Sequence, residues 1–134
     1  MISQMFRNKA AKQSTKLFTP GNQKRDWVYV DDVVQACWLA MNKLVGITTT
    51  EYHDIFNVGS GTSTTFNDLA KAIYGHYTSS FRIEYVDCPF EKAYQSYTEC
   101  DLTKIKEHLG YEPQYNLHDG IEEYKKTLLF HSEE

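Results

Sequence analysis

Arg25 is the residue whose type and position most directly suggest a binding role. It lies after a predicted turn at residues 20–22 and just before an aromatic and β-branched run at 27–30, which predicts a strand. A guanidinium in this position can bind a phosphate through two parallel hydrogen bonds. The alternative is a solvated surface pair with Asp26 or another acid, which contributes little to stability. The residues alone are compatible with both interpretations.

Two loops are further candidates. The Gly-Ser-Gly loop at 59–61 follows an apolar segment and precedes a predicted helix, so its backbone N–H groups could bind an anion. The alternative is a tight connection that needs a positive φ. Tyr94 and Tyr97 lie in a polar stretch after Pro89, where tyrosines either line ligand sites or pack as partly buried aromatics.

Several catalytic signatures do not occur in these residues. The sequence contains no GxGxxG or GxxGxxG dinucleotide fingerprint, no P-loop and no GxSxG, and no tyrosine is followed by lysine four residues later. The three cysteines form no CxxC pair and the five histidines have no HxxxH spacing. We therefore expect neither a disulfide framework nor a metal site, and reduced thiols of the cytoplasm are the default.

The composition limits the class of protein. The chain has 134 residues, a hydrophobic fraction of 41% and a net charge of −4. These values predict a soluble globular chain, either one domain or part of a larger one. The acidic balance argues against general binding to nucleic acid or anionic membranes. No apolar run approaches the roughly 20 residues of a membrane span.

The periodicity predicts an α/β chain with the element order αββαβαβαα. We predict helices at 2–12, 31–43, 65–77, 101–109 and from Asn116 onward. We predict strands at 16–19, 27–30, 55–58 and 81–86. Short strands that alternate with helices are typical of α/β folds.

The helix boundaries follow from capping residues. Asp31 or Asp32 is expected to cap the second helix, and Thr64 or Thr65 the third. The inner face of the second helix is predicted to consist of Val33, Val34, Cys37, Trp38 and Met41. That of the third is predicted to consist of Phe66, Leu69, Ala70, Ile73, Tyr74 and Tyr77. Gly46 and the threonines at 48–50 should end the second helix, Gly110 the fourth, and a Glu122–Lys126 pair should support the last.

Four segments together resemble the C-terminal half of the extended short-chain dehydrogenase/reductases, which include the nucleotide-sugar epimerases and dehydratases. They are RDWVYVDDV at 25–33, FNVGSG at 56–61, TFNDLA at 65–70, and Asp101 with LGYEP at 109–113. The resemblance runs from about residue 1 to residue 128. It implies a Rossmann-type α/β protein of which this chain is the substrate-binding portion, with the segments 27–30 and 55–58 completing the edge of the main sheet.

Within that class, the chain resembles the ADP-L-glycero-D-manno-heptose 6-epimerases. The motifs are KLF at 16–18 before KRD at 24–26, and IEY at 83–85 before YQSYTECDLT at 94–103. The resemblance implies that the ADP-sugar contacts Phe18, Thr19, Pro20, Gly21, Arg25 and Tyr94. The chain departs from the family in a shorter loop before Arg25 and in Ala93, where the family has arginine.

The family's chemistry implies partners that these residues do not supply. Its members invert C6 of the heptose with bound NADP (or NAD), form homopentamers, and carry a glycine-rich cofactor loop and a Tyr-xxx-Lys pair. Since both motifs do not occur here, we expect neither turnover nor NADP binding by this chain alone, and no catalytic residue within it. The alternatives are a fragment of another nucleotide-sugar epimerase or dehydratase, and a non-catalytic binding module.

Overall fold

The computed structural model describes residues 1–45, 53–75 and 83–130 and divides the chain into two compact units. Unit 1 comprises residues 1–25 and 63–98, and unit 2 comprises residues 26–62 and 99–134. The predicted positions of Gly46, the 48–50 threonines, Tyr77 and the start of strand 81–86 lie outside the described residues.

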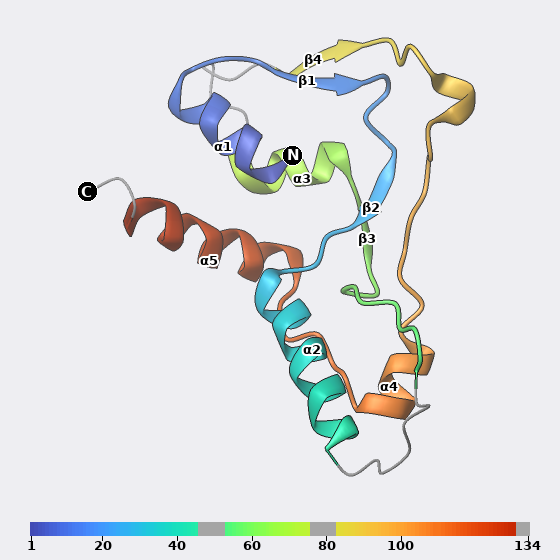
Figure 1. Ribbon diagram of the computed structural model, residues 1–134. Helices are drawn as coiled ribbons and strands as arrows, with labels where there is room; N and C mark the ends of the chain where they lie inside the picture. Colours follow the sequence, from blue (N-terminus) through green and yellow to red (C-terminus); the bar gives the residue numbers. More distant parts are fainter. Residues whose placement is uncertain (46–52, 76–82, 131–134) are drawn as a thin grey trace. The chain divides into compact units, whose positions relative to one another are not determined.

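Unit 1 contains a parallel strand pair and two helices. β1 (Thr15–Phe18) pairs with β4 (Ile83–Val86), with Thr15 opposite Ile83 and Phe18 opposite Val86. α1 (Ile2–Ala10) and α3 (Phe66–Tyr74) lie side by side (Figure 1). These elements confirm the predicted first and third helices and the strands near 16–19 and 81–86.

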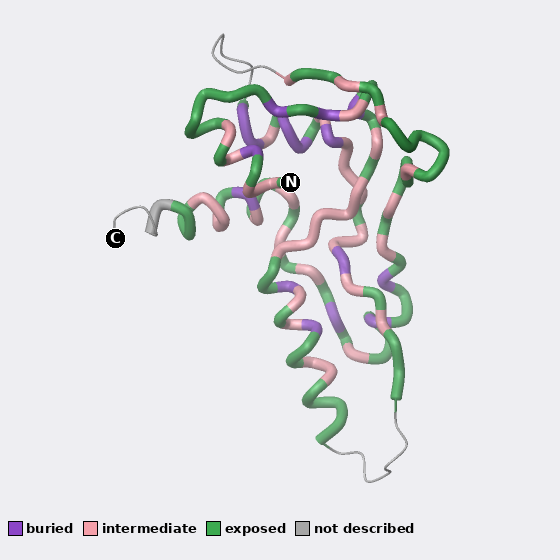
Figure 2. The backbone as a smooth tube through the Cα atoms, turned by 45° about the horizontal axis from the view of Figure 1, so that its top comes forward, coloured by how far each residue is buried: buried purple, intermediate pink, exposed green. Residues whose placement is uncertain are grey.

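The core of unit 1 is formed mainly by one face of α3. Its buried residues are Phe66, Leu69, Ala70, Ile73 and Tyr74, as the helical spacing predicts, and Met5 and Leu17 are buried with them (Figure 2). The Tyr74 hydroxyl donates to the Met5 carbonyl at 3.0 Å and lies 2.7 Å from Thr15 Oγ1. Burial raises the pKa of Tyr74, because the neutral phenol is the form that an apolar core tolerates.

Unit 2 contains α2 (Val30–Leu44), α4 (Thr103–Leu109) and α5 (Leu117–Phe130). Its core cluster consists of Ala36, Leu102, Ile105 and Tyr111, against which Leu39, Phe56, Val58, Cys100 and Leu109 pack. Gly110 ends α4 in the left-handed conformation at φ 68° and ψ 23°, and Asn116 Oδ1 accepts from the Asp119 N–H at 3.0 Å. The predicted end of α4 at Gly110 and the predicted start of α5 at Asn116 are therefore confirmed.

Two predicted strands are wrong. β2 (Lys24–Asp26) and β3 (Ser63–Thr65) form the second two-stranded sheet, whereas 27–30 and 55–58 contain no described strand. Instead, α2 begins at Val30. A strand needs a neighbour to complete its hydrogen bonds, and no described segment pairs with either run. The order αββαβαβαα is retained, with a short 3-10 turn η1 (Glu91–Ala93) before α4.

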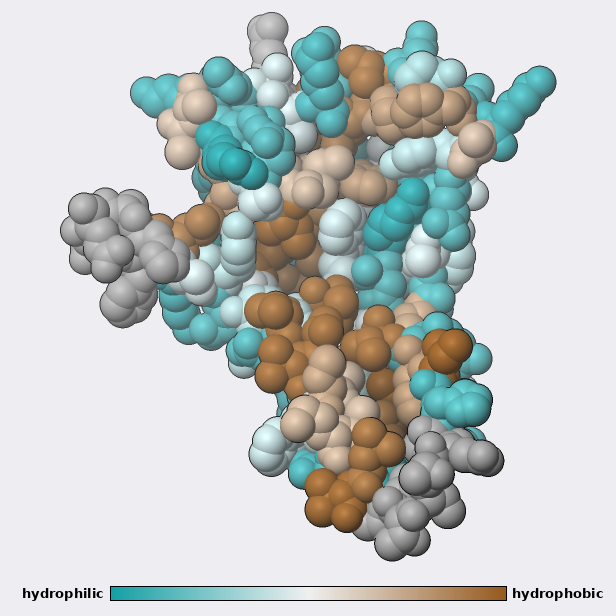
Figure 3. Space-filling view, viewed as in Figure 1, coloured by the Kyte–Doolittle hydropathy of each residue, from teal (hydrophilic) through white to brown (hydrophobic). Residues whose placement is uncertain are grey.

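The predicted inner face of α2 is also wrong. Ala36 and Asp32 are its buried residues, and the exposed apolar side chains form one helical face that we call the α2 stripe. Its members are Val30, Val34, Trp38, Met41 and Val45, all at least 60% exposed. Figure 3 shows apolar side chains gathered over α2. The i, i+4, i+8 spacing marks an apolar face but does not say what covers it.

Two charged contacts differ from expectation. Neither Asp31 nor Asp32 caps α2, whose N-cap is Tyr29; the buried Asp32 carboxylate instead accepts from the backbone N–H groups of Gln114 at 2.7 Å and Tyr115 at 3.2 Å. On α5, Lys126 pairs with Glu123 at 2.6 Å rather than with the predicted Glu122. Among the described residues no helix is long and apolar enough to cross a membrane.

Candidate functional site

A pocket of about 280 Å³ lies within unit 1. It is lined by Thr19, Pro20, Asn22, Gln23, Cys88, Glu91, Tyr94 and Ser96. The volume is close to the lower end of small-molecule sites, and the lining combines an aromatic ring with hydroxyl, amide and carboxylate groups. The pocket can therefore offer one ring face and several hydrogen-bonding groups to a ligand.

The end of β1 places Thr19 and Pro20 in the pocket. The Thr19 N–H extends the ladder by donating to the Val86 carbonyl at 2.9 Å, and a cis Thr19-Pro20 peptide bond follows. Gly21 has φ 79° and donates its N–H to the Phe18 carbonyl at 2.7 Å. The loop therefore turns sharply at the end of a strand, in agreement with the predicted turn at 20–22.

Tyr94, which lines the pocket, belongs to a cluster of three aromatic rings. Its ring meets the Phe18 ring edge to face, with centroids 5.1 Å apart and an interplanar angle of 86°. Phe18 makes a second edge-to-face contact with Phe90 at 6.0 Å. Such contacts fix the orientation of a ring beyond what burial alone does. Tyr97, the other predicted loop tyrosine, is 51% exposed and does not line the pocket.

Arg25 lies against the same tyrosine. Its guanidinium carbon is 5.3 Å from the Tyr94 ring centroid and 5.7 Å from that of Phe66. Nη2 donates to the Gln95 carbonyl at 2.7 Å and Nη1 to the Lys24 carbonyl at 2.7 Å. Within the described residues Arg25 makes no ion pair with Asp26 or another acid. A guanidinium with five N–H donors keeps donors beyond these two bonds.

The structure therefore brings five of the six predicted substrate residues to one place. Thr19, Pro20 and Tyr94 line the pocket, and Phe18 and Arg25 contact the Tyr94 ring. Gly21 does not line it. The prediction missed Asn22, Gln23, Cys88, Glu91 and Ser96. Most of these are close in sequence to predicted residues, which is the signal that could have found them, whereas Cys88 depends on the tertiary fold.

The glycine loop is occupied by the chain's own carboxylate, within unit 2. Asp26 Oδ1 accepts from the Ser60 N–H and hydroxyl, both at 2.7 Å, and Oδ2 accepts from the N–H groups of Gly61 at 2.9 Å and Cys100 at 3.1 Å. Gly61 has φ 73°. The N–H groups of the loop therefore bind a carboxylate of the chain itself rather than a ligand, and the positive φ of Gly61 confirms the tight connection. Among the described residues no cluster of His, Cys, Asp or Glu could hold a metal ion.

Comparisons with known proteins agree with this architecture. Residues 1–124 match the family model described as GDP-mannose 4,6 dehydratase. A curated relative, the ADP-L-glycero-D-manno-heptose-6-epimerase of Nitratidesulfovibrio vulgaris strain DP4, is 33% identical over 115 residues, which cover 84% of this chain and 33% of the relative. The chain thus spans about a third of the length of that relative.

Solved structures of nucleotide-sugar epimerases also match this chain. The Helicobacter pylori ADP-L-glycero-D-manno-heptose-6-epimerase matches 95% of this chain and 37% of its own, at 28% identity and a TM-score of 0.74. The UDP-glucose 4-epimerase of Thermotoga maritima, solved with UDP-glucose, matches 95% of this chain and 40% of its own, at 30% identity and a TM-score of 0.69. The chain therefore belongs to the GDP-mannose 4,6 dehydratase family of NAD-dependent nucleotide-sugar epimerases and dehydratases, and its mixed α/β fold matches their C-terminal part.

Proposed function

We propose that this chain is the substrate-binding portion of an ADP-L-glycero-D-manno-heptose 6-epimerase and that its pocket binds the ADP-sugar. The observation that supports this function is the convergence of Thr19, Pro20 and Tyr94 on one pocket, with Arg25 against the Tyr94 ring. The 33% identity to a heptose epimerase favours this substrate. The proposed role places the chain in the synthesis of lipopolysaccharide heptose, in the cytoplasm.

The chemistry of the pocket fits a nucleoside diphosphate. The remaining N–H donors of Arg25 can bind a diphosphate with charge-assisted hydrogen bonds, while its contact with Tyr94 keeps the guanidinium plane oriented. The hydroxyls of Thr19 and Ser96 and the carboxylate of Glu91 supply the polar contacts that sugar hydroxyls require. In this proposal the chain binds and orients the substrate.

The cofactor of the whole enzyme, NADP or NAD, would supply hydride chemistry when bound. These 134 residues contain neither the glycine fingerprint nor a Tyr-xxx-Lys pair, so they do not fit a dinucleotide site. No hydride-transfer step is assigned to this chain. For the whole protein we propose the homopentamer that the family resemblance implies.

Calorimetric titration with ADP-, UDP- and dTDP-sugars tests the function. We expect the ADP-sugar to bind most tightly, and Arg25→Ala to weaken its binding by about 10- to 150-fold, which corresponds to roughly 1.5–3 kcal/mol for charge-assisted hydrogen bonds. Arg25→Lys should recover only part, because an ammonium lacks the two-pronged geometry. Arg7→Ala on α1, an exposed arginine, is the matched control. Equal affinities of the wild type and Arg25→Ala would contradict the role of Arg25.

A UDP-sugar epimerase is the second candidate. The Thermotoga maritima enzyme, solved with UDP-glucose, has 30% identity to this chain, against 28% for the Helicobacter pylori heptose epimerase. Tighter binding of the UDP-sugar in the same titration would favour this candidate. Binding of none of the three nucleotides would leave a non-catalytic binding module.

A further inference from the structure

The pocket loop is held by the first turn of α3. The Phe66 N–H donates to the Gln23 carbonyl and the Asn67 N–H to the Gly21 carbonyl, both at 3.1 Å. The first N–H groups of a helix have no partner within that helix. Here the loop carbonyls are their acceptors, so the start of α3 and the loop are joined through the backbone.

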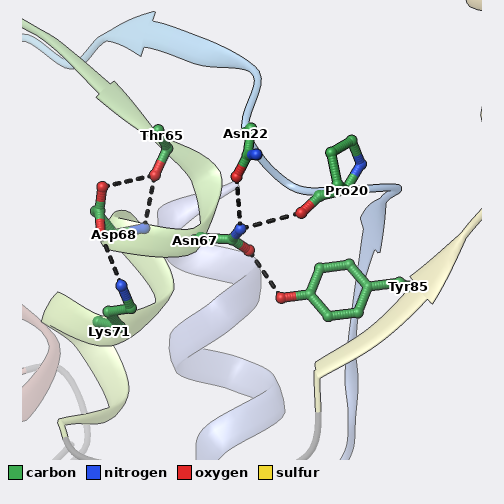
Figure 4. A network of polar contacts seen from close by, with 7 residues as sticks. All are labelled: Pro20, Asn22, Thr65, Asn67, Asp68, Lys71 and Tyr85. Carbon is green, nitrogen blue, oxygen red and sulfur yellow. Dashed lines mark hydrogen bonds and ion pairs between the residues drawn. The ribbon is translucent and has the colours of Figure 1, made fainter.

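The Asn67 side chain adds three directional contacts. Its Nδ2 donates to the Pro20 carbonyl at 3.0 Å and to Asn22 Oδ1 at 3.1 Å, while its Oδ1 accepts from the Tyr85 hydroxyl at 2.9 Å (Figure 4). Both amide hydrogens are thus directed to the two sides of Gly21. Since Pro20 and Asn22 line the pocket, this one amide fixes two elements of its wall.

Gly21 allows the amide to approach so closely. A Cβ built on Gly21 would lie 2.3 Å from Asn67 Oδ1 and 2.8 Å from Asn67 Cγ, far inside van der Waals contact. The φ of 79° is also one that other residues rarely adopt. Gly21 therefore packs against Asn67 and does not line the pocket.

The start of α3 is itself well fixed. Thr65 Oγ1 accepts from the Asp68 N–H at 3.0 Å and donates to Asp68 Oδ2 at 2.7 Å, and Lys71 pairs with Asp68 Oδ1 at 3.0 Å (Figure 4). The Thr65 hydrogen bond and then Lys71 lower the pKa of Asp68. Asn67 therefore projects from a capped helical turn, which makes it a firm support for the loop.

We propose that Asn67 is a positioning residue of the pocket: its amide holds the loop 19–22 in the conformation that binds ligand, without touching the ligand itself. This inference rests on the proposed function, because the ligand of the pocket is taken to be the ADP-sugar. It adds a residue from α3 to a site whose predicted members lie in two other segments of the chain.

The Asn67→Asp variant tests this role because it keeps the shape and removes the donors. At neutral pH its carboxylate would place an acceptor opposite the Pro20 carbonyl, so that bond is lost and becomes repulsive, while the Asn22 amide must turn over to donate its own Nδ2. We expect the affinity for the ADP-sugar to fall at least about tenfold, the effect of one hydrogen bond to the loop, with an unchanged circular dichroism spectrum. Asn42→Asp, at an exposed position of α2, is the control for the added charge.

The pH profile separates positioning from a general effect. In Asn67→Asp the Pro20 carbonyl disfavours the charged carboxylate, whereas the Tyr85 hydroxyl donates to it; the protonated carboxyl group can again donate one hydrogen bond to the loop. The affinity of Asn67→Asp, relative to wild type at the same pH, should therefore recover in part as the pH falls toward about 4, the reference pKa of an aspartate. Asn67→Ala should show no such recovery. An equal pH profile for the two variants would overturn the proposal.

Hydrogen exchange gives a readout that needs no ligand. The Gly21 N–H, which donates to the Phe18 carbonyl at 2.7 Å, should exchange at least about tenfold faster in Asn67→Asp and remain protected in Asn42→Asp. Unchanged exchange overturns the proposal, whatever the affinity. If the wild type binds no nucleotide sugar, the proposed function fails, while faster Gly21 exchange still supports the positioning role. If Asn67→Asp does not fold, Tyr85→Phe, at a 47% exposed position, should cause a smaller change of the same sign.

Discussion

Replacing Asp26 by asparagine tests how the glycine loop is held. The carboxylate accepts two hydrogen bonds from Ser60, one from Gly61 and one from Cys100. An amide of the same shape has only one acceptor oxygen, so one side of the group must lose its match. Asp26→Asn therefore changes hydrogen bonding and charge but not volume.

The hydrogen-bond partners on the two sides of residue 26 decide which way the new amide turns. With the amide nitrogen toward Gly61 and Cys100, two backbone N–H groups would face a donor. With it toward Ser60, the Ser60 hydroxyl can rotate and accept, and only the Ser60 N–H loses its partner. Losing one charge-assisted bond and weakening the others predicts a loss of about 2–4 kcal/mol in the free energy of unfolding. That is a large share of the roughly 5–15 kcal/mol of a typical domain.

Urea unfolding followed by tryptophan fluorescence measures this loss, since the chain has two tryptophans and one of them, Trp27, adjoins Asp26. Asp87→Asn, an exposed position, is the control for charge. Hydrogen exchange should localise the effect to the N–H groups of Ser60, Gly61 and Cys100. A change below about 0.5 kcal/mol, the usual range for surface substitutions, would refute the inferred role of the carboxylate.

Two further predictions concern pH and the exposed apolar surface. Burial, followed by the charge of Asp32, raises the pKa of Tyr111 to about 12. Because this pKa in the folded chain lies above the unfolded value of about 10, the contribution of Tyr111 to the free energy of unfolding should be fully present below pH 10 and fall between about pH 10 and 12. Tyr111→Phe, which also removes the hydroxyl's bond to the Gly59 carbonyl, should lose less stability over that range in unfolding experiments. The α2 stripe should make the chain bind a hydrophobic dye and self-associate. Trp38→Glu should reduce dye fluorescence and light scattering. If neither signal changes, dye binding and self-association depend on another surface.

Local sequence determined most of the helices. In α3, Thr65 supplies the cap and the apolar spacing from Phe66 to Tyr74 selects the buried face, since both depend only on neighbours within one or two turns. Gly110 and Asn116 likewise mark helix ends through their own backbone and side-chain chemistry. The turn before Arg25 followed from the Pro-Gly-Asn residues at 20–22, and the family resemblance implied that Arg25 and Tyr94 serve one binding site.

Only the tertiary structure decided the partners of groups that are distant in sequence. The carboxylate of Asp26 meets residues 60, 61 and 100, and that of Asp32 meets residues 114 and 115, because chain folding brings those N–H groups together. The runs at 27–30 and 55–58 have strand-forming residues, yet no strand in the described part of the chain pairs with either of them. The sequence gives no signal that Asn67 contacts the pocket loop, since its hydrogen bonds with Pro20, Asn22 and Tyr85 exist only after β1, α3 and β4 have come together.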